Sequence, residues 1–83
     1  MDTRERIRRF IVENFYVRNA AELADDDLLV NGGIIDSTGM LEVISFLEGA
    51  FGIRIADTDT TPENLESIDR MVQFVDRKRR SAA

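Results

Sequence analysis

The chain has 83 residues, and its 43% hydrophobic content is enough for one small core but not for two. It contains neither cysteine nor histidine. This excludes disulfide bonds, thiolate nucleophiles, thiol or imidazole metal ligands and the usual general base near neutral pH. The N-terminus has no signal-peptide pattern and the chain has no long apolar run, so we expect a cytoplasmic protein without a membrane span.

The net charge of −5 is unevenly distributed along the chain. Residues 1–18 carry five arginines against three acids, residues 19–69 one arginine against twelve acids, and residues 70–83 five bases against one acid. The acidic middle predicts attraction to basic partner surfaces and repulsion of nucleic acid. Plain solubility is the alternative explanation of the same charge.

The first predicted element is a helix over about residues 3–17. Asp2 followed by Glu5 is typical of a helix start, and apolar residues then recur at helical spacing. These residues are Ile7, Phe10, Ile11, Phe15 and Val17. The opposite face carries Arg4, Arg8, Arg9 and Glu13, which we expect to be solvated.

Residues 18–36 show no sustained period and predict a long loop, which is uncommon in so small a domain and tends to be functional. Its expected anchors are Leu23, Leu28, Leu29, Ile34 and Ile35. The acidic triplet 25–27 and the later Asp57-Thr58-Asp59 do not form an EF-hand loop. Counted from Asp57, Pro62 stands where that loop needs glycine and Ile68 where it needs glutamate, so we expect no metal site.

A second helix is predicted from Ser37 to about Ala50, with Gly52 just beyond its end. Its core side consists of Met40, Val43, Ile44, Leu47 and Phe51. The opposite side holds Thr38, Glu42, Ser45 and Gly49, with Leu41, Phe46 and Glu48 on the flanks. The apolar flanks, Leu41 and Phe46, are either ordinary surface residues or partner contacts.

The remaining residues predict two more helices. Ile53 and Ile55 alternate with polar or small residues as in a strand, but no second strand is available to pair with them, so we expect a loop. Thr61-Pro62-Glu63 starts a short helix over about residues 62–66, and Ser67 caps a helix over about residues 67–79 with a frayed tail at 80–83. The buried stripe of this last helix is Ile68, Met71, Val72 and Val75. The order predicts a single domain, a small all-α four-helix bundle.

Ser37 stands at the start of the second helix, where free N–H groups and the helix dipole favour an anion on its hydroxyl. As a catalytic nucleophile it would need a base, but the local carboxylate is Asp36 and the sole lysine, Lys78, lies in the basic tail. We therefore do not expect an enzyme. Ser37 either caps a helix or receives a group attached by another enzyme.

Three segments resemble the acyl carrier protein family, which includes peptidyl and aminoacyl carriers. They are Gly33-Ile34-Ile35-Asp36-Ser37, Leu41-Glu42-Val43 with Leu47-Glu48-x-x-Phe51-Gly52-Ile53, and Thr61-Pro62-Glu63-Asn64-Leu65. The resemblance covers nearly the whole chain. It implies that a separate magnesium-dependent phosphopantetheinyl transferase moves 4′-phosphopantetheine from coenzyme A to Ser37, beside Asp36. The thiol of that arm then holds an acyl or aminoacyl group as a thioester.

The resemblance also implies partners: a loading ligase or adenylation enzyme, and downstream synthases or transferases of fatty-acid or specialised metabolite biosynthesis. They would dock on the second helix of a monomeric carrier, at Thr38, Leu41, Glu42, Ser45 and Glu48. Members of the family usually have a larger apolar residue after the modified serine, whereas this chain has Thr38. Glu42 and Glu48 are the acids of this helix, and Gly39 and Gly49 stand where a fatty-acid carrier would have more charge. Asp36-Ser37-x-Gly39 followed by an apolar helix is similar to some discrete carriers of amino acids and of specialised metabolism. The alternative is an unmodified helical adaptor that binds partners through the same face.

Overall fold

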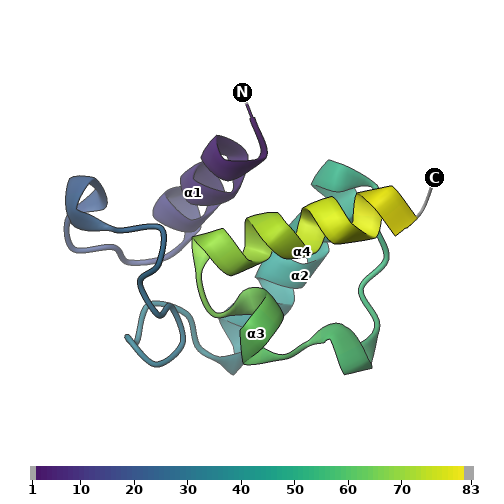
Figure 1. Cartoon of the computed structure of the whole chain (residues 1–83). Helices are drawn as coiled ribbons and strands as arrows, with labels where there is room; N and C mark the ends of the chain where they lie inside the picture. Colours follow the sequence, from purple (N-terminus) through teal and green to yellow (C-terminus); the bar gives the residue numbers. More distant parts are fainter. Residues whose placement is uncertain (1, 82–83) are drawn as a thin grey trace.

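The computed structural model describes residues 2–81 and contains four helices, α1 to α4 (Figure 1). Their bounds are Thr3–Asn14, Ser37–Phe51, Pro62–Leu65 and Ile68–Ser81. Short 3₁₀ turns occupy Ala20–Glu22 and Asp57–Asp59, and residues 2–81 contain no strand. The all-α four-helix bundle is confirmed.

Helix α1 starts where the sequence indicates and ends earlier. The Asp2 carboxylate accepts the backbone N–H of Glu5 at 2.8 Å, which caps the first turn. The apolar spacing predicts a helix to residue 17, but α1 ends at Asn14 and the backbone of Phe15 is extended, with φ −129° and ψ 158°. Phe15 still packs against the core although it lies beyond the helix. The helical spacing of apolar residues therefore continues past the last helical residue.

Helix α2 ends at Phe51, one residue beyond the predicted end, because Gly52 adopts the left-handed backbone of a C-terminal cap, with φ 65°. Helix α3 ends at Leu65, one residue before the predicted end.

Helix α4 begins after Ser67, whose Oγ accepts the backbone N–H of Arg70 at 3.2 Å, so the predicted cap is confirmed. The helix continues to Ser81, and residues 80 and 81, predicted as frayed, are helical. The rest of the predicted tail, residues 82–83, lies outside the described residues.

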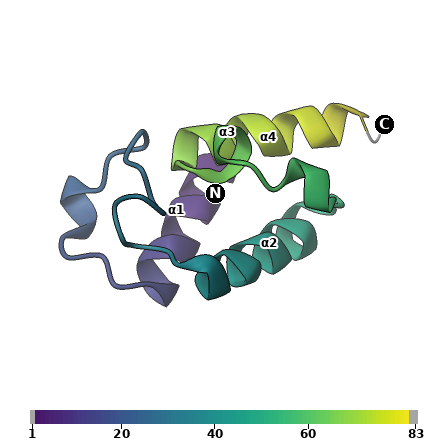
Figure 2. The same cartoon turned by 90° about the horizontal axis from the view of Figure 1, so that it is seen from below.

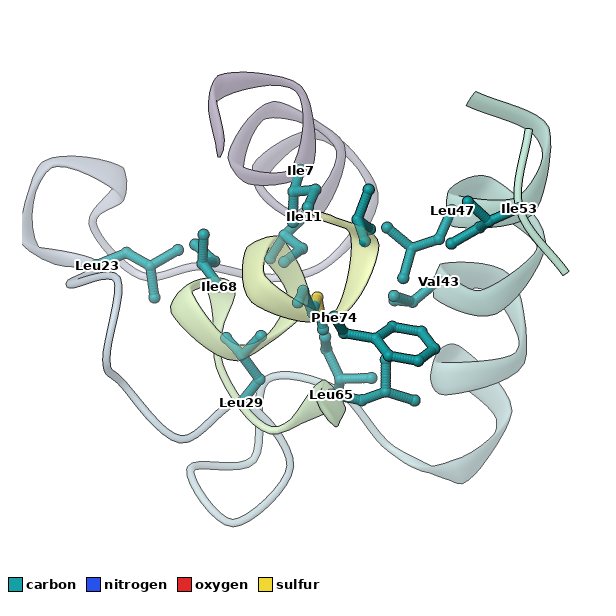
Figure 3. Packing of buried hydrophobic residues seen from close by; sticks show 13 residues of the cluster. Ile7, Ile11, Leu23, Leu29, Val43, Leu47, Ile53, Leu65, Ile68 and Phe74 are labelled. Carbon is teal, nitrogen blue, oxygen red and sulfur yellow. The ribbon is translucent and has the colours of Figure 1, made fainter. Parts of the chain in front are cut away.

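The hydrophobic core draws side chains from all four helices and from the first loop (Figure 3). Helix α4 contacts each of the other helices. The buried residues are Ile7, Ile11, Leu23, Leu29, Ile35, Val43, Leu47, Ile53, Leu65, Ile68, Met71, Phe74 and Val75. Three predicted loop anchors are among them, whereas Ile34 is half-buried and Leu28 is exposed, so Leu28 was wrongly predicted to be an anchor.

Phenylalanine rings join α1 to α2. Phe10 and Phe46 stack with ring centroids 4.2 Å apart, and Phe51 meets Phe46 edge-on at 6.0 Å. Phe46 is therefore half-buried against α1 rather than a free partner contact. The Phe15 ring lies so close to Gly39 that a Cβ atom at position 39 would be 2.6 Å from Phe15 Cε1. Gly39 is needed because of this approach between the end of α1 and the first turn of α2.

The first loop is tied to α1 and α4 by charged groups. Asp25 accepts hydrogen bonds from Arg8 and from Arg4, at 2.8 Å for Arg4 Nη1, and Arg4 also donates to Asp69. Arg4 and Arg8, which we expected to be solvated, therefore bind the first loop. Arg9 of the same face pairs with Glu13 at 3.3 Å on the exposed surface. The hydrogen bond from Arg8, with the charges of both arginines, holds the pKa of Asp25 below its ordinary value.

We predict that Gly39→Ala destabilises the protein by about 1–3 kcal/mol, because the added methyl group overlaps the Phe15 ring. Urea unfolding followed by circular dichroism measures this free energy. Gly49→Ala is the matched control: it lies in the same helix, no atom lies within 4 Å of its added Cβ, and it should stabilise α2 by roughly 0.5–1 kcal/mol. Equal effects of the two substitutions would contradict the proposed contact.

We predict that Asp25→Asn makes the free energy of unfolding less dependent on pH under acidic conditions. A carboxyl whose pKa is lowered in the folded state stabilises the fold above its unfolded pKa, and this contribution is lost as the pH falls through the folded pKa. The free energy of unfolding of the wild type should therefore decrease more steeply below about pH 4 than that of Asp25→Asn. The exposed Asp26, changed to Asn, is the control. If Asp25→Asn and the wild type showed parallel profiles, the ion pairs would not stabilise the loop.

Candidate functional site

Ser37 is the first residue of α2, and its side chain is exposed. Asp36 is the N-cap, and its carboxylate accepts the backbone N–H of Gly39 at 2.7 Å. In the part of the chain that the structure describes, the backbone N–H groups of Ser37 and Thr38 have no hydrogen-bond partner. The serine hydroxyl therefore stands beside two free donors at the positive end of a 15-residue helix.

The turn before Ser37 is fixed by its own backbone. The carbonyl of Leu29 accepts the N–H groups of Ile34 and Ile35 at 2.9 and 3.0 Å. Gly33 has a φ of 81°, which favours glycine because other residues rarely adopt it. Ile35, buried in the core, then anchors the chain immediately before Asp36.

Glu66 fastens this turn to the C-terminal end of α3. Its carbonyl accepts the N–H of Leu29 at 2.8 Å, and its Oε1 accepts the N–H of Asn31 at 3.1 Å. The residue is only 7% exposed. The sequence analysis did not identify Glu66. The available signal was its position: it is an acid between Leu65 and Ser67, and both of these neighbours are buried.

A cleft of about 280 Å³ opens beside Ser37. Helix α2 forms one wall, and the segment from Thr60 to Glu66 forms the other; Figure 2 shows α2 along one side of the molecule and α3 with α4 along the other. The lining residues are Val30, Asp36, Ser37, Met40, Leu41, Ile44, Thr60, Thr61, Pro62, Leu65 and Glu66. The surface is mostly apolar, with carboxylates from Asp36 and Glu66 as its charged groups.

The predicted docking residues of α2 divide into two groups. Thr38, Leu41, Glu42 and Ser45 are exposed, and 65% of Leu41 is accessible. Glu48 is half-buried, and its Oε2 accepts the N–H of Ile55 at 2.9 Å, which ties the segment after α2 to the helix. One carboxylate oxygen of Glu48 is therefore already occupied within the protein.

The acidic clusters have internal partners. Asp27 accepts the N–H of Ala24 at 2.8 Å, and Asp59 pairs with Lys78 at 2.6 Å. Lys78, and then the N–H of Ala56, hold the pKa of Asp59 below its ordinary value. Among residues 2–81 no group of three or more histidine, cysteine, aspartate or glutamate side chains is placed to hold a metal ion. Within the same residues, no helix has the length and apolar character to cross a membrane.

Comparison with known proteins finds D-alanyl carrier proteins among the relatives of this chain. The D-alanyl carrier protein of Streptococcus suis (strain 98HAH33) is 29% identical over 75 residues, covering 90% of this chain and 92% of the relative. That of Streptococcus sanguinis (strain SK36) is 28% identical over 65 residues, covering 78% and 81%. No protein-family model matches.

The chain is similar to proteins of the acyl carrier type. The similarity to the relatives spans most of both chains, and the helical bundle is the architecture that the sequence resemblance implies. These relatives support a carrier role. In this chain, Asp36 and Ser37 line the cleft, and both residues are exposed.

Proposed function

We propose that the carrier holds its cargo on a 4′-phosphopantetheine arm attached to Ser37. The observation that supports this is the exposed hydroxyl at the start of α2, next to the free N–H groups of Ser37 and Thr38. A phosphodiester at this position is stabilised by those donors and by the helix dipole.

Attachment is a transfer from coenzyme A on a phosphopantetheinyl transferase. A bond forms between Ser37 Oγ and the phosphorus next to pantetheine, the pyrophosphate bond breaks, and adenosine 3′,5′-bisphosphate leaves while the transferase accepts the serine proton. The arm supplies a thiol, which the cysteine-free chain lacks, and this thiol carries the cargo as a thioester.

We propose that the carrier itself is not an enzyme. Ser37 has no histidine available, the carboxylate of Asp36 accepts the Gly39 N–H, and the sole lysine, Lys78, pairs with Asp59. No activated nucleophile is therefore assembled from these groups. Loading and transfer of the cargo belong to partner proteins in the cytoplasm.

The cargo that we propose is an aminoacyl group, from within the predicted acyl and aminoacyl range. Its support is the name of the relatives, which are D-alanyl carrier proteins. The partners are then a transferase, an adenylating ligase that loads the amino acid and a downstream enzyme that removes it. The fatty-acid and specialised-metabolite settings remain predictions of the sequence.

The exposed face of α2 is the surface that we propose for docking these partners. Close to Ser37 in the sequence, this face carries one apolar side chain, Leu41, and one acid, Glu42. Thr38 and Ser45 add hydroxyl groups. Glu42 forms no ion pair within residues 2–81, so its charge is available to a basic partner surface.

We predict that the wild type, incubated with coenzyme A and a broad-specificity phosphopantetheinyl transferase, gains the mass of one phosphopantetheinyl group. Ser37→Ala should gain none, because it lacks the accepting oxygen. Intact-protein mass spectrometry measures both, and circular dichroism verifies that the variant is folded. A wild type left unmodified by several transferases would contradict the attachment and favour the unmodified adaptor.

We predict that Glu42→Lys slows loading of the arm, because the substitution places a positive charge where a basic partner docks. Reversal of one exposed contact should lower the loading rate roughly tenfold with an unchanged helical signal. Asp76→Lys is the matched control, since it makes the same charge change at an exposed position of α4. Equal slowing by both variants would show an effect of net charge rather than of the α2 face.

A further inference from the structure

Glu66 is a buried acid with one oxygen uncommitted. Its Oε1 accepts the Asn31 N–H, and within residues 2–81 its Oε2 has no hydrogen-bond partner. The same residues contain no enclosed side-chain oxygen or nitrogen that lacks a partner, so Oε2 is not sealed in the core. Glu66 is also one of the residues that line the cleft beside Ser37.

The charged residues that line the cleft are all acidic. Asp36 and Glu66 line it, and no lysine or arginine does. Asp36 is exposed to water and caps α2, whereas Glu66 is more than nine-tenths buried. A buried carboxylate attracts a cation more strongly than an exposed one, since less water screens it.

We infer that Glu66 binds the ammonium group of an aminoacyl cargo when the loaded arm folds back into the cleft. The inference rests on the proposed attachment of the arm to Ser37, and it adds the residue that selects the cargo. Ser37 and Glu66 line one cleft, so the single bonds of the arm allow its loaded end to return to the wall opposite its attachment.

The dimensions and the walls of the cleft suit a small amino acid. The cleft has a volume of about 280 Å³, and an apolar cavity of about 150 Å³ is enough to bind benzene, so a small side chain with part of the arm fits into the cleft. Met40, Leu41 and Ile44 cover the apolar part of the cargo, while Glu66 neutralises its positive charge. A cargo with a second carboxylate would be repelled by both acids.

The test uses the full-length protein with three arms attached to Ser37. One arm ends in a stable alanyl amide, the second in an isobutyryl amide, which replaces the ammonium by a methyl group of similar size, and the third carries no cargo. Backbone amide shifts in nuclear magnetic resonance spectra report docking, above all at Asn31, whose N–H donates to Glu66. We predict that the docked fraction of the alanyl arm exceeds that of the isobutyryl arm roughly threefold, and that added salt reduces the excess.

Glu66→Gln separates recognition from the structural role of this residue. Glutamine keeps an oxygen for the Asn31 N–H but removes the charge, so the turn should persist while the preference for the alanyl arm disappears. Glu63→Gln is the matched control: Glu63 is an exposed acid of α3 that does not line the cleft, and its variant should keep the preference.

The two proposals fail in different ways. A missing mass gain in every sample would overturn the attachment to Ser37 and this inference together. Attached arms that dock equally with and without the ammonium in the wild type would overturn the role of Glu66 alone. That comparison needs no variant, so it decides the question even if Glu66→Gln fails to fold. Persistence of the alanyl preference in a folded Glu66→Gln would likewise overturn the inference.

Discussion

The position of the candidate site depends on hydrogen bonds between the first loop and residues 66–69, where α3 ends and α4 begins. The backbone N–H of Asp69 donates to the carbonyl of Asp25 at 2.9 Å, and the N–H of Leu29 donates to the carbonyl of Glu66 at 2.8 Å. A loop with one short 3₁₀ turn cannot satisfy these groups itself, so partners far along the sequence supply them. The arginine pairs of Asp25 and the buried Leu29 strengthen the same attachment.

The consequence of this attachment is a serine presented on a fixed turn. The backbone that precedes Ser37 is fastened at Glu66, and the helix that follows it is fastened to α1 by the phenylalanine rings. The arm that we propose is therefore joined to a turn that hydrogen bonds and packing hold in place. The exposed face of α2, which we propose for partners, and the cleft, which we propose for the cargo, both adjoin Ser37.

The helices and the position of Ser37 at a helix start were predictable because their signals are local. Asp2, Ser67 and Gly52 mark helix ends through the nearest backbone groups, and apolar spacing marks the buried stripes. The misplaced end of α1, the ion pairs of Arg4 and Arg8 and the role of Glu66 were not predictable, because each depends on groups more than a dozen residues away. Phe46 has a flank position on its own helix, and only the stack with Phe10 determines its burial.

The contact between Phe15 and Gly39 means that the side chains at these two positions compete for the same space. The ring fills the space that any side chain at position 39 would occupy. A protein of this fold with a larger residue at the position of Gly39 must therefore accept a smaller one at the position of Phe15, or move α1 away from the first turn of α2. The size of a residue at the end of the first helix thus limits which residues can stand two positions after Ser37.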